Sequence, residues 1–148
     1  MSASPQYLSF ANVYNGLLYS LMSWQQLTRF WEKSIDAGAG WYLYAIGEAR
    51  PEKPANAHQV KQFIREIDML LHHEHCEDYC GIVYADDIEA PTLVKIYDPN
   101  HLGSSCGSGK TPPPLPGWLM SRMPPDEMTP RRIIPANRKR WWRSFFTG

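Results

Sequence analysis

The sequence predicts a small α+β fold, a two-layer α/β sandwich with a proline-rich C-terminal arm. Two stretches have the apolar spacing of helices, three short runs are rich in aromatic and β-branched residues, and eight of the thirteen prolines lie between residues 112 and 135. These elements follow the order α-β-α-β-β, and a chain of 148 residues is long enough to bury a core. We therefore expect two helices on a three-stranded mixed sheet.

Both expected helices have an apolar stripe and a start signal. In the first, residues 10–35, apolar side chains recur every three or four positions, and Ser9 is a suitable N-cap. The second begins after Asn56, which forms a capping-box pattern with Gln59, and its apolar residues between 60 and 71 share one face. Both helices can therefore cover a sheet.

The three expected strands differ in their surroundings. Residues 41–46 are apolar on both faces, which is typical of a strand that is covered on both sides. Residues 80–87 and 92–98 are β-branched and aromatic runs separated by an acidic turn, so they predict a hairpin. A right-handed crossover would pair the first two strands in parallel, with the third antiparallel beside one of them.

The distribution of residue types divides the chain into three parts. We expect a compact α/β domain at 1–103, a Gly/Ser- and Pro-rich arm at 104–135, and a basic-aromatic amphipathic terminus at 136–148. The formal net charge is zero, but residues 1–116 hold 8 Lys or Arg against 13 Asp or Glu, whereas 117–148 hold 7 against 2. This asymmetry favours either docking of the tail on its own domain or attraction to an anionic partner.

The C-terminal sequence "NRKRWWRSFF" is the most distinctive interaction signal. As a helix it places bulky rings on one face and basic side chains mainly on the other, which suits a groove on a protein partner, a second copy of the chain or an anionic membrane surface. A single basic patch beside an acidic body makes nucleic acid a poor fit. The candidate partner-binding residues are Trp118, Arg138, Lys139, Arg140, Trp141, Trp142, Arg143, Phe145 and Phe146.

The segment "LLHHEHCEDYCG" is a candidate metal site. Helical spacing puts His72, His75 and Cys76 on one flank, and Cys80 could add a fourth ligand from the following strand. Imidazole and thiolate ligands favour zinc or iron. The alternative is a polar helix end, where histidines are favoured by the helix dipole and cysteines are small buried groups.

Other motifs depart from the spacing that catalysis requires. "GSSCGSGKT" resembles the end of a phosphate-binding loop, but Ser104 stands where the first glycine belongs and prolines follow instead of a helix. Thiol chemistry at Cys76 or Cys106 lacks an oriented third group, and the acids at 74–87 are typical of turns.

These observations together favour binding over catalysis. Three cysteines, an odd number, and the absence of a signal-like N-terminus predict a cytoplasmic location. We therefore expect a cytoplasmic accessory or adaptor protein that is not an enzyme, needs no cofactor, and binds a protein partner or itself. One alternative is a zinc- or iron-binding protein or a metal-dependent enzyme centred on the segment "HHEHCEDYC", and another is peripheral membrane attachment through the C-terminus.

Overall fold

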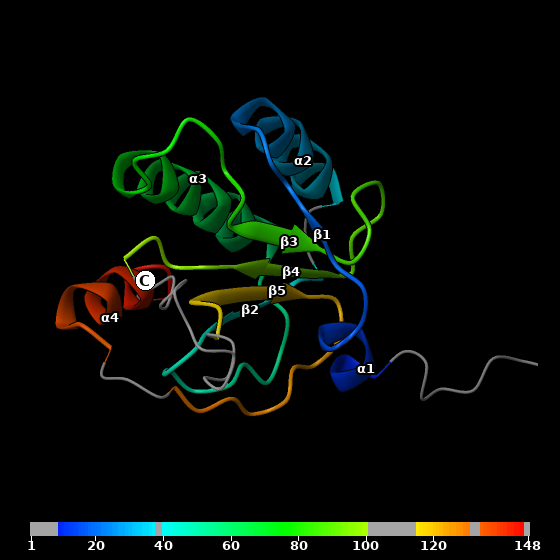
Figure 1. Cartoon of the computed structure of the whole chain (residues 1–148). Helices are drawn as coiled ribbons and strands as arrows, with labels where there is room; N and C mark the ends of the chain where they lie inside the picture. Colours follow the sequence, from blue (N-terminus) through cyan, green and yellow to red (C-terminus); the bar gives the residue numbers. More distant parts are fainter. Residues whose placement is uncertain (1–8, 38–39, 101–114, 131–133, 147–148) are drawn as a thin grey trace, which may run out of the picture.

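The computed structural model describes residues 9–37, 40–100, 115–130 and 134–146 (Figure 1). Within these residues the chain forms four helices and one five-stranded sheet, so the α+β class is confirmed. In chain order the elements are α1 (Phe10–Tyr14), β1 (Tyr19–Ser20), α2 (Trp24–Ala37), β2 (Tyr42–Ala45), α3 (Ala57–Glu74), β3 (Val83–Ala85), β4 (Leu93–Ile96), β5 (Trp118–Ser121) and α4 (Ala136–Arg143).

The sheet differs from the expected one in size and topology. Its strand order is β1-β3-β4-β5-β2, and every neighbouring pair is antiparallel. The hairpin of β3 and β4 is confirmed, but the mixed three-stranded sheet and its parallel pair are wrong. The reason is β5, which comes from the proline-rich segment and pairs Leu119 with Lys95 of β4 on one side and with Tyr44 of β2 on the other. β2 is therefore an edge strand, and β4 and β5 separate it from β3.

The predicted first helix is two helices. α1 ends at Tyr14, and β1 lies between it and α2, where Tyr19 pairs with Ala85 of β3. α2 starts after Ser23, whose hydroxyl accepts a hydrogen bond from the Gln26 amide at 2.9 Å. The apolar spacing continues unbroken across this gap, so periodicity alone could not reveal it.

Helix α3 is confirmed with its predicted start. The Asn56 side chain accepts from the Gln59 amide at 2.8 Å, and the Gln59 side chain accepts from the Asn56 amide at 3.0 Å. The apolar stripe of α3 is buried. Since the capping box satisfies two amides that the first turn leaves unpaired, it fixes where the helix begins and where the preceding loop ends.

Both faces of the sheet are covered. Figure 1 shows α2 and α3 on one face and α1 on the other. The main core lies under α2, α3 and α4, and a smaller cluster on the second face comprises Phe10, Tyr44, Ile46, Leu93 and Leu119. The Tyr44 hydroxyl holds the chain after β5 over this second face, because it accepts from the Met128 amide at 2.9 Å and donates to the Met128 carbonyl at 3.1 Å.

A tight turn directs the chain out of β2. Gly47 has a φ of +108°, a conformation that favours glycine, and a Cβ there would lie 2.7 Å from Ile134. The Glu48 amide donates to the Ala45 carbonyl at 3.0 Å and closes the turn. The loop 49–55 then runs beside the sheet to the start of α3, where the Ala55 amide donates to the Trp41 carbonyl at 2.8 Å.

Candidate partner-binding groove

Helix α4 is attached to the main core by its aromatic side chains. Trp142 is 7% exposed, and Phe145, just beyond the helix, is 5% exposed. Both contact the ring of Phe63 on α3, with centroid separations of 5.9 and 6.0 Å. Trp141 lies edge-on to Trp118 of β5 at 5.4 Å. Because each ring removes a large apolar area from water, these contacts hold α4 against the sheet and α3.

A buried cluster of charges fixes the position of α4. Arg138 donates two hydrogen bonds to Glu74 at 2.6 and 3.1 Å, and two to Asp98 at 3.0 and 3.1 Å. The side chains of Arg138 and Asp98 are 9% and 4% exposed. Asn100 donates a further hydrogen bond to Glu74. We call Glu74, Asp98 and Arg138 the clasp, since they join the end of α3 and the residues after β4 to the first turn of α4.

The ionisation of the clasp is stabilised by its hydrogen bonds. Those from Arg138 lower the pKa of Glu74 below its ordinary value, although burial opposes this. Burial alone would lower the pKa of Arg138, but the hydrogen bonds to Glu74 and Asp98 outweigh it and raise that pKa. Glu74 and Arg138 therefore stay charged at neutral pH.

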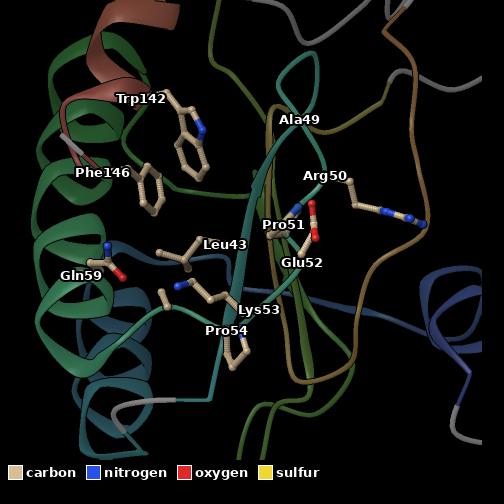
Figure 2. Close-up of a pocket in the computed structure, with 11 residues that line it drawn as sticks. Leu43, Ala49, Arg50, Pro51, Glu52, Lys53, Pro54, Gln59, Trp142 and Phe146 are labelled. Atoms are coloured by element: carbon tan, nitrogen blue, oxygen red, sulfur yellow. The ribbon is translucent and has the colours of Figure 1, made fainter.

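A groove of about 720 Å³ lies between α4, the loop 49–55 and the start of α3. Leu43 of β2 lies between its walls, and Figure 2 shows Trp142 and Phe146 reaching toward it from the α4 side. Phe146 is 45% exposed and lies 5.1 Å from Trp142, ring to ring. The full lining is Leu43, Ala49, Arg50, Pro51, Glu52, Lys53, Pro54, Ala55, Gln59, Trp142 and Phe146.

The groove combines apolar surface with a basic group. Figure 2 shows Lys53 extending from the loop toward the space beside Leu43, whereas Arg50 points away from it. At the neighbouring end of the loop, Arg143 of α4 forms an ion pair with Glu48 at 3.2 Å. Proline and aromatic side chains with a cation nearby can contact an apolar side chain flanked by an acidic one.

The structure separates the predicted partner-binding residues into three groups by their exposure. Trp118, Arg138, Trp142 and Phe145 are buried within the chain. Lys139 and Trp141 are half-buried, while Arg140, Arg143 and Phe146 are exposed. We expected the aromatic face to bind a partner or a membrane. The part of that face that remains exposed is mainly Phe146. In the described residues no helix is both long and apolar enough to cross a membrane.

The four predicted metal ligands do not converge. The buried His75 ring places Nε2 at 2.9 Å from the Cys80 carbonyl, while His72 stacks on Trp24 at 4.1 Å between ring centroids. Cys80 is buried, and burial raises the pKa of its thiol, whereas Cys76 is exposed. Across the described ranges, no three His, Cys, Asp or Glu side chains form a group that could hold a metal ion. His75 is instead the C-cap residue of α3.

Three acids of this region have structural partners. Glu74 belongs to the clasp, and Asp86 accepts hydrogen bonds from the amides of Thr92 and Leu93 at 2.8 and 2.9 Å, which closes the β3–β4 hairpin. Asp87 accepts from two amides of the same turn. Cys106 and the Gly/Ser segment around it lie outside the described residues.

Sequence reasoning missed the loop side of the groove. Two prolines and several charges identify residues 49–55 as a loop, but no local pattern places that loop opposite the C-terminal helix. The contact depends on β5, which brings the C-terminal segment back to the sheet beside β2. To predict β5, three apolar residues and a serine after a proline run would have had to be identified as a strand.

Comparison with known proteins adds no relative: the chain matches no model of a protein family, and no curated protein or solved structure is significantly similar to it. The fold and the groove therefore define the class, an α+β protein with a five-stranded antiparallel sheet and an aromatic groove beside an edge strand.

Proposed function

We propose that this chain is an accessory or adaptor protein whose groove binds an extended segment of a larger protein partner. The observation that carries the proposal is Phe146, an aromatic side chain just beyond α4 that remains 45% exposed, whereas Trp142 and Phe145 are buried. Aromatic side chains at the edge of an apolar groove are frequent anchors of protein interfaces.

The clasp supports binding by a preformed surface. Arg138 has four hydrogen bonds to two carboxylates, so α4 has one orientation on the domain. A groove wall that is already ordered loses little conformational entropy when a ligand binds, and affinity rises accordingly.

The groove also indicates the chemistry of the partner. Leu43, Pro54 and Phe146 offer apolar contact, and Lys53 offers a positive charge beside them. We expect a partner segment with a bulky apolar side chain next to an acidic one, because the two features would meet the groove and Lys53 together.

The cysteines support a cytoplasmic location as part of the same proposal. The chain has three, and Cys76 and Cys80 are free thiols. Unpaired cysteines are typical of proteins that stay in a reducing compartment.

Site-specific crosslinking tests the groove. We expect p-benzoylphenylalanine at position 146 to capture a partner in cells, and the same group at position 69 to capture none. Met69 is the matched control because it is an exposed apolar residue on α3, outside the groove, at 57% exposure. The partner segment, identified by mass spectrometry, is then titrated against the purified full chain by calorimetry.

Two variants and two controls decide the outcome. Phe146→Ala and Lys53→Glu should each weaken binding by about tenfold or more, since a hot-spot side chain contributes about 1.4 kcal/mol or more. Met69→Ala and Lys61→Glu should bind like the wild type. Wild-type affinity in Phe146→Ala and Lys53→Glu would contradict the proposal, and so would crosslinks only to a second copy, which would indicate self-assembly.

A further inference from the structure

A lysine lies in the middle of the sheet, on the face opposite the groove. Lys95 belongs to β4, the central strand, and is 9% exposed. Its neighbours Val94 and Ile96 point into the main core, so the side chain of Lys95 points to the second face. On that face it lies with Leu93 and with Leu119 of β5. Lysine is rarely buried in such surroundings unless an acid accompanies it.

Lys95 has no acidic partner among the described residues. None of their ion pairs involves it, and its ammonium instead lies 3.5 Å from the centroid of the Tyr14 ring on α1. Burial lowers the pKa of Lys95 below its ordinary value. For each unit by which a lysine pKa falls, the neutral amine at neutral pH becomes about ten times more abundant.

Three tyrosines lie around this part of the sheet. The Tyr14 ring contacts the Lys95 ammonium, Tyr84 of β3 is the cross-strand partner of Lys95, and Tyr97, directly after β4, lies 5.6 Å from Tyr84 between ring centroids. Burial, helped by Tyr97, raises the pKa of Tyr14 to about 12, and burial and Tyr84 raise the pKa of Tyr97. The phenols of Tyr14 and Tyr97 therefore stay protonated at neutral pH and can donate protons or hydrogen bonds.

The geometry points to Lys95 as an amine nucleophile that captures a small carbonyl compound, an aldehyde or keto acid, as a reversible imine. A lysine desolvated in apolar surroundings is the usual form of an imine-forming amine, and protonated phenols beside it are suitable acids. This activity goes beyond partner binding and needs no turnover, because the captured compound can remain on the protein.

The reaction balances without a further reactant. The Lys95 nitrogen attacks the carbonyl carbon, the carbon–oxygen π bond breaks, and the oxygen takes a proton from a neighbouring phenol to give a carbinolamine. The nitrogen returns a proton to that phenolate. The phenol then protonates the hydroxyl as the remaining carbon–oxygen bond breaks and water leaves, and the nitrogen gives its last proton back to the phenolate as the imine forms. No atom is oxidised or reduced overall.

The amine keeps a route to solvent. In the described residues the fully enclosed side-chain nitrogen and oxygen atoms without a partner are Trp41 Nε1 and one oxygen of Glu48, and Lys95 Nζ is not among them. α1 covers the site with a helix of only five residues. Since Lys95 is 9% exposed, a small carbonyl compound would have to approach it past this short helix, beside Tyr14.

Reductive trapping of the full chain tests this inference directly. Glyoxylate, a small aldehyde, is added with sodium cyanoborohydride, whose hydride reduces an imine to a stable amine, and peptide mass spectrometry measures each lysine. Lys61, exposed on α3, is the internal control. We expect Lys95 to be labelled about ten times faster than Lys61 at neutral pH, with a ratio that falls as the pH approaches the ordinary lysine pKa of about 10.4.

Substitution of tyrosine by phenylalanine removes the phenol hydroxyl and keeps the ring, so it tests the role of the hydroxyl. Tyr14→Phe and Tyr97→Phe should each slow labelling of Lys95 several-fold, whereas Tyr79→Phe, an exposed tyrosine elsewhere, should leave it unchanged. Labelling of Lys95 no faster than that of Lys61 at neutral pH in the wild-type chain would overturn the inference. So would a ratio of the two rates that does not change with pH.

Discussion

At the scale of single residues, the guanidinium of Arg138 joins the basic and the acidic parts of the chain through ion pairs. The basic C-terminal part supplies Arg138, and the acidic part supplies Glu74 and Asp98. A buried ion pair gives little net stability because desolvation offsets the attraction, but loss of one partner leaves an uncompensated charge. The clasp thus acts mainly by selecting one position for α4.

Replacement of Arg138 by alanine should be strongly destabilising. Arg138→Ala leaves the buried carboxylate of Asp98 without its partner, and we expect the free energy of unfolding to fall by about 3–5 kcal/mol. Urea unfolding followed by tryptophan fluorescence measures the change. Arg140→Ala is the matched control, because Arg140 is exposed on the same helix and should cost about 0.5 kcal/mol or less. Equal stabilities of the two variants would show that the clasp does not hold α4.

Replacement of Lys95 should raise the free energy of unfolding, whereas replacement of Arg138 lowers it, and the gain should depend on pH. Because burial lowers the folded-state pKa of Lys95, the unfolded chain binds more protons between the folded and unfolded values, and stability rises with pH across that window. At neutral pH, Lys95→Met removes a buried charge without an acidic partner, so we expect a gain of about 1 kcal/mol.

The same unfolding assay at neutral pH and at pH about 10 measures this effect, since the ordinary lysine pKa is about 10.4. The advantage of Lys95→Met should shrink at the higher pH, where a larger fraction of the wild-type lysine is neutral. Lys61→Met, at an exposed position, is the control and should show neither the gain nor its pH dependence. A Lys95→Met variant that is less stable than the wild type at neutral pH would contradict the expectation.

At the scale of elements, local signals predicted those elements whose burial pattern is complete within one segment. The stripe and capping box of α3, the doubly covered β2 and the β3–β4 hairpin are of this kind. β5 has only four residues after a proline run, and its stability comes from the two strands beside it. Strand propensity depends on such neighbours, so sequence alone could not identify it.

The candidate site was predictable only in part for a related reason. The sequence indicates that α4 has an aromatic face, but burial against the chain itself and burial against a partner use the same apolar contacts. Trp142 and Phe145 are buried in the core, and Phe146 is exposed at the groove. This division depends on where β5 and the clasp place the helix, which no spacing of residues reveals.

Truncation at two positions should separate the contributions of β5 and α4. A chain that ends at residue 135 lacks α4 but keeps all five strands, so we expect cooperative unfolding at a lower temperature. A chain that ends at residue 116 also lacks β5, which lies between β4 and β2, and should lose cooperative unfolding altogether. Near-UV circular dichroism during heating measures both. A cooperative transition in the shorter chain would mean that the sheet does not require β5.

At the scale of the whole molecule, the two proposed sites are on opposite faces of one sheet. Leu43 and Trp142 of the groove belong to the main core under α2, α3 and α4, whereas Lys95 lies on the face covered by α1. The central strands β4 and β5 separate the two faces. A substitution in the groove therefore does not contact Lys95, and a substitution at Lys95 does not contact the groove. The experiments on the two proposals are therefore independent of each other.

The arrangement of strands also predicts how stability is distributed. β4 and β5 have a strand on both sides, and every residue of both strands is buried. β1 has two residues at the edge of the sheet, where Tyr19 is 48% exposed. Amides open locally where few buried contacts hold them, so hydrogen exchange should be fastest in β1 and slowest in β4 and β5.

Hydrogen exchange of the full chain, measured by mass spectrometry or NMR, tests this order. We expect the amides of β4 and β5 to exchange only by global unfolding, with a protection that follows the free energy of unfolding in urea. In Arg138→Ala the protection of β4 and β5 should fall by the same free energy as global stability, since loss of the clasp weakens the whole fold, while β1 should change little because its amides already exchange by local opening. Protection of β1 equal to that of β4 would show instead that the edge strand and the centre open as one unit.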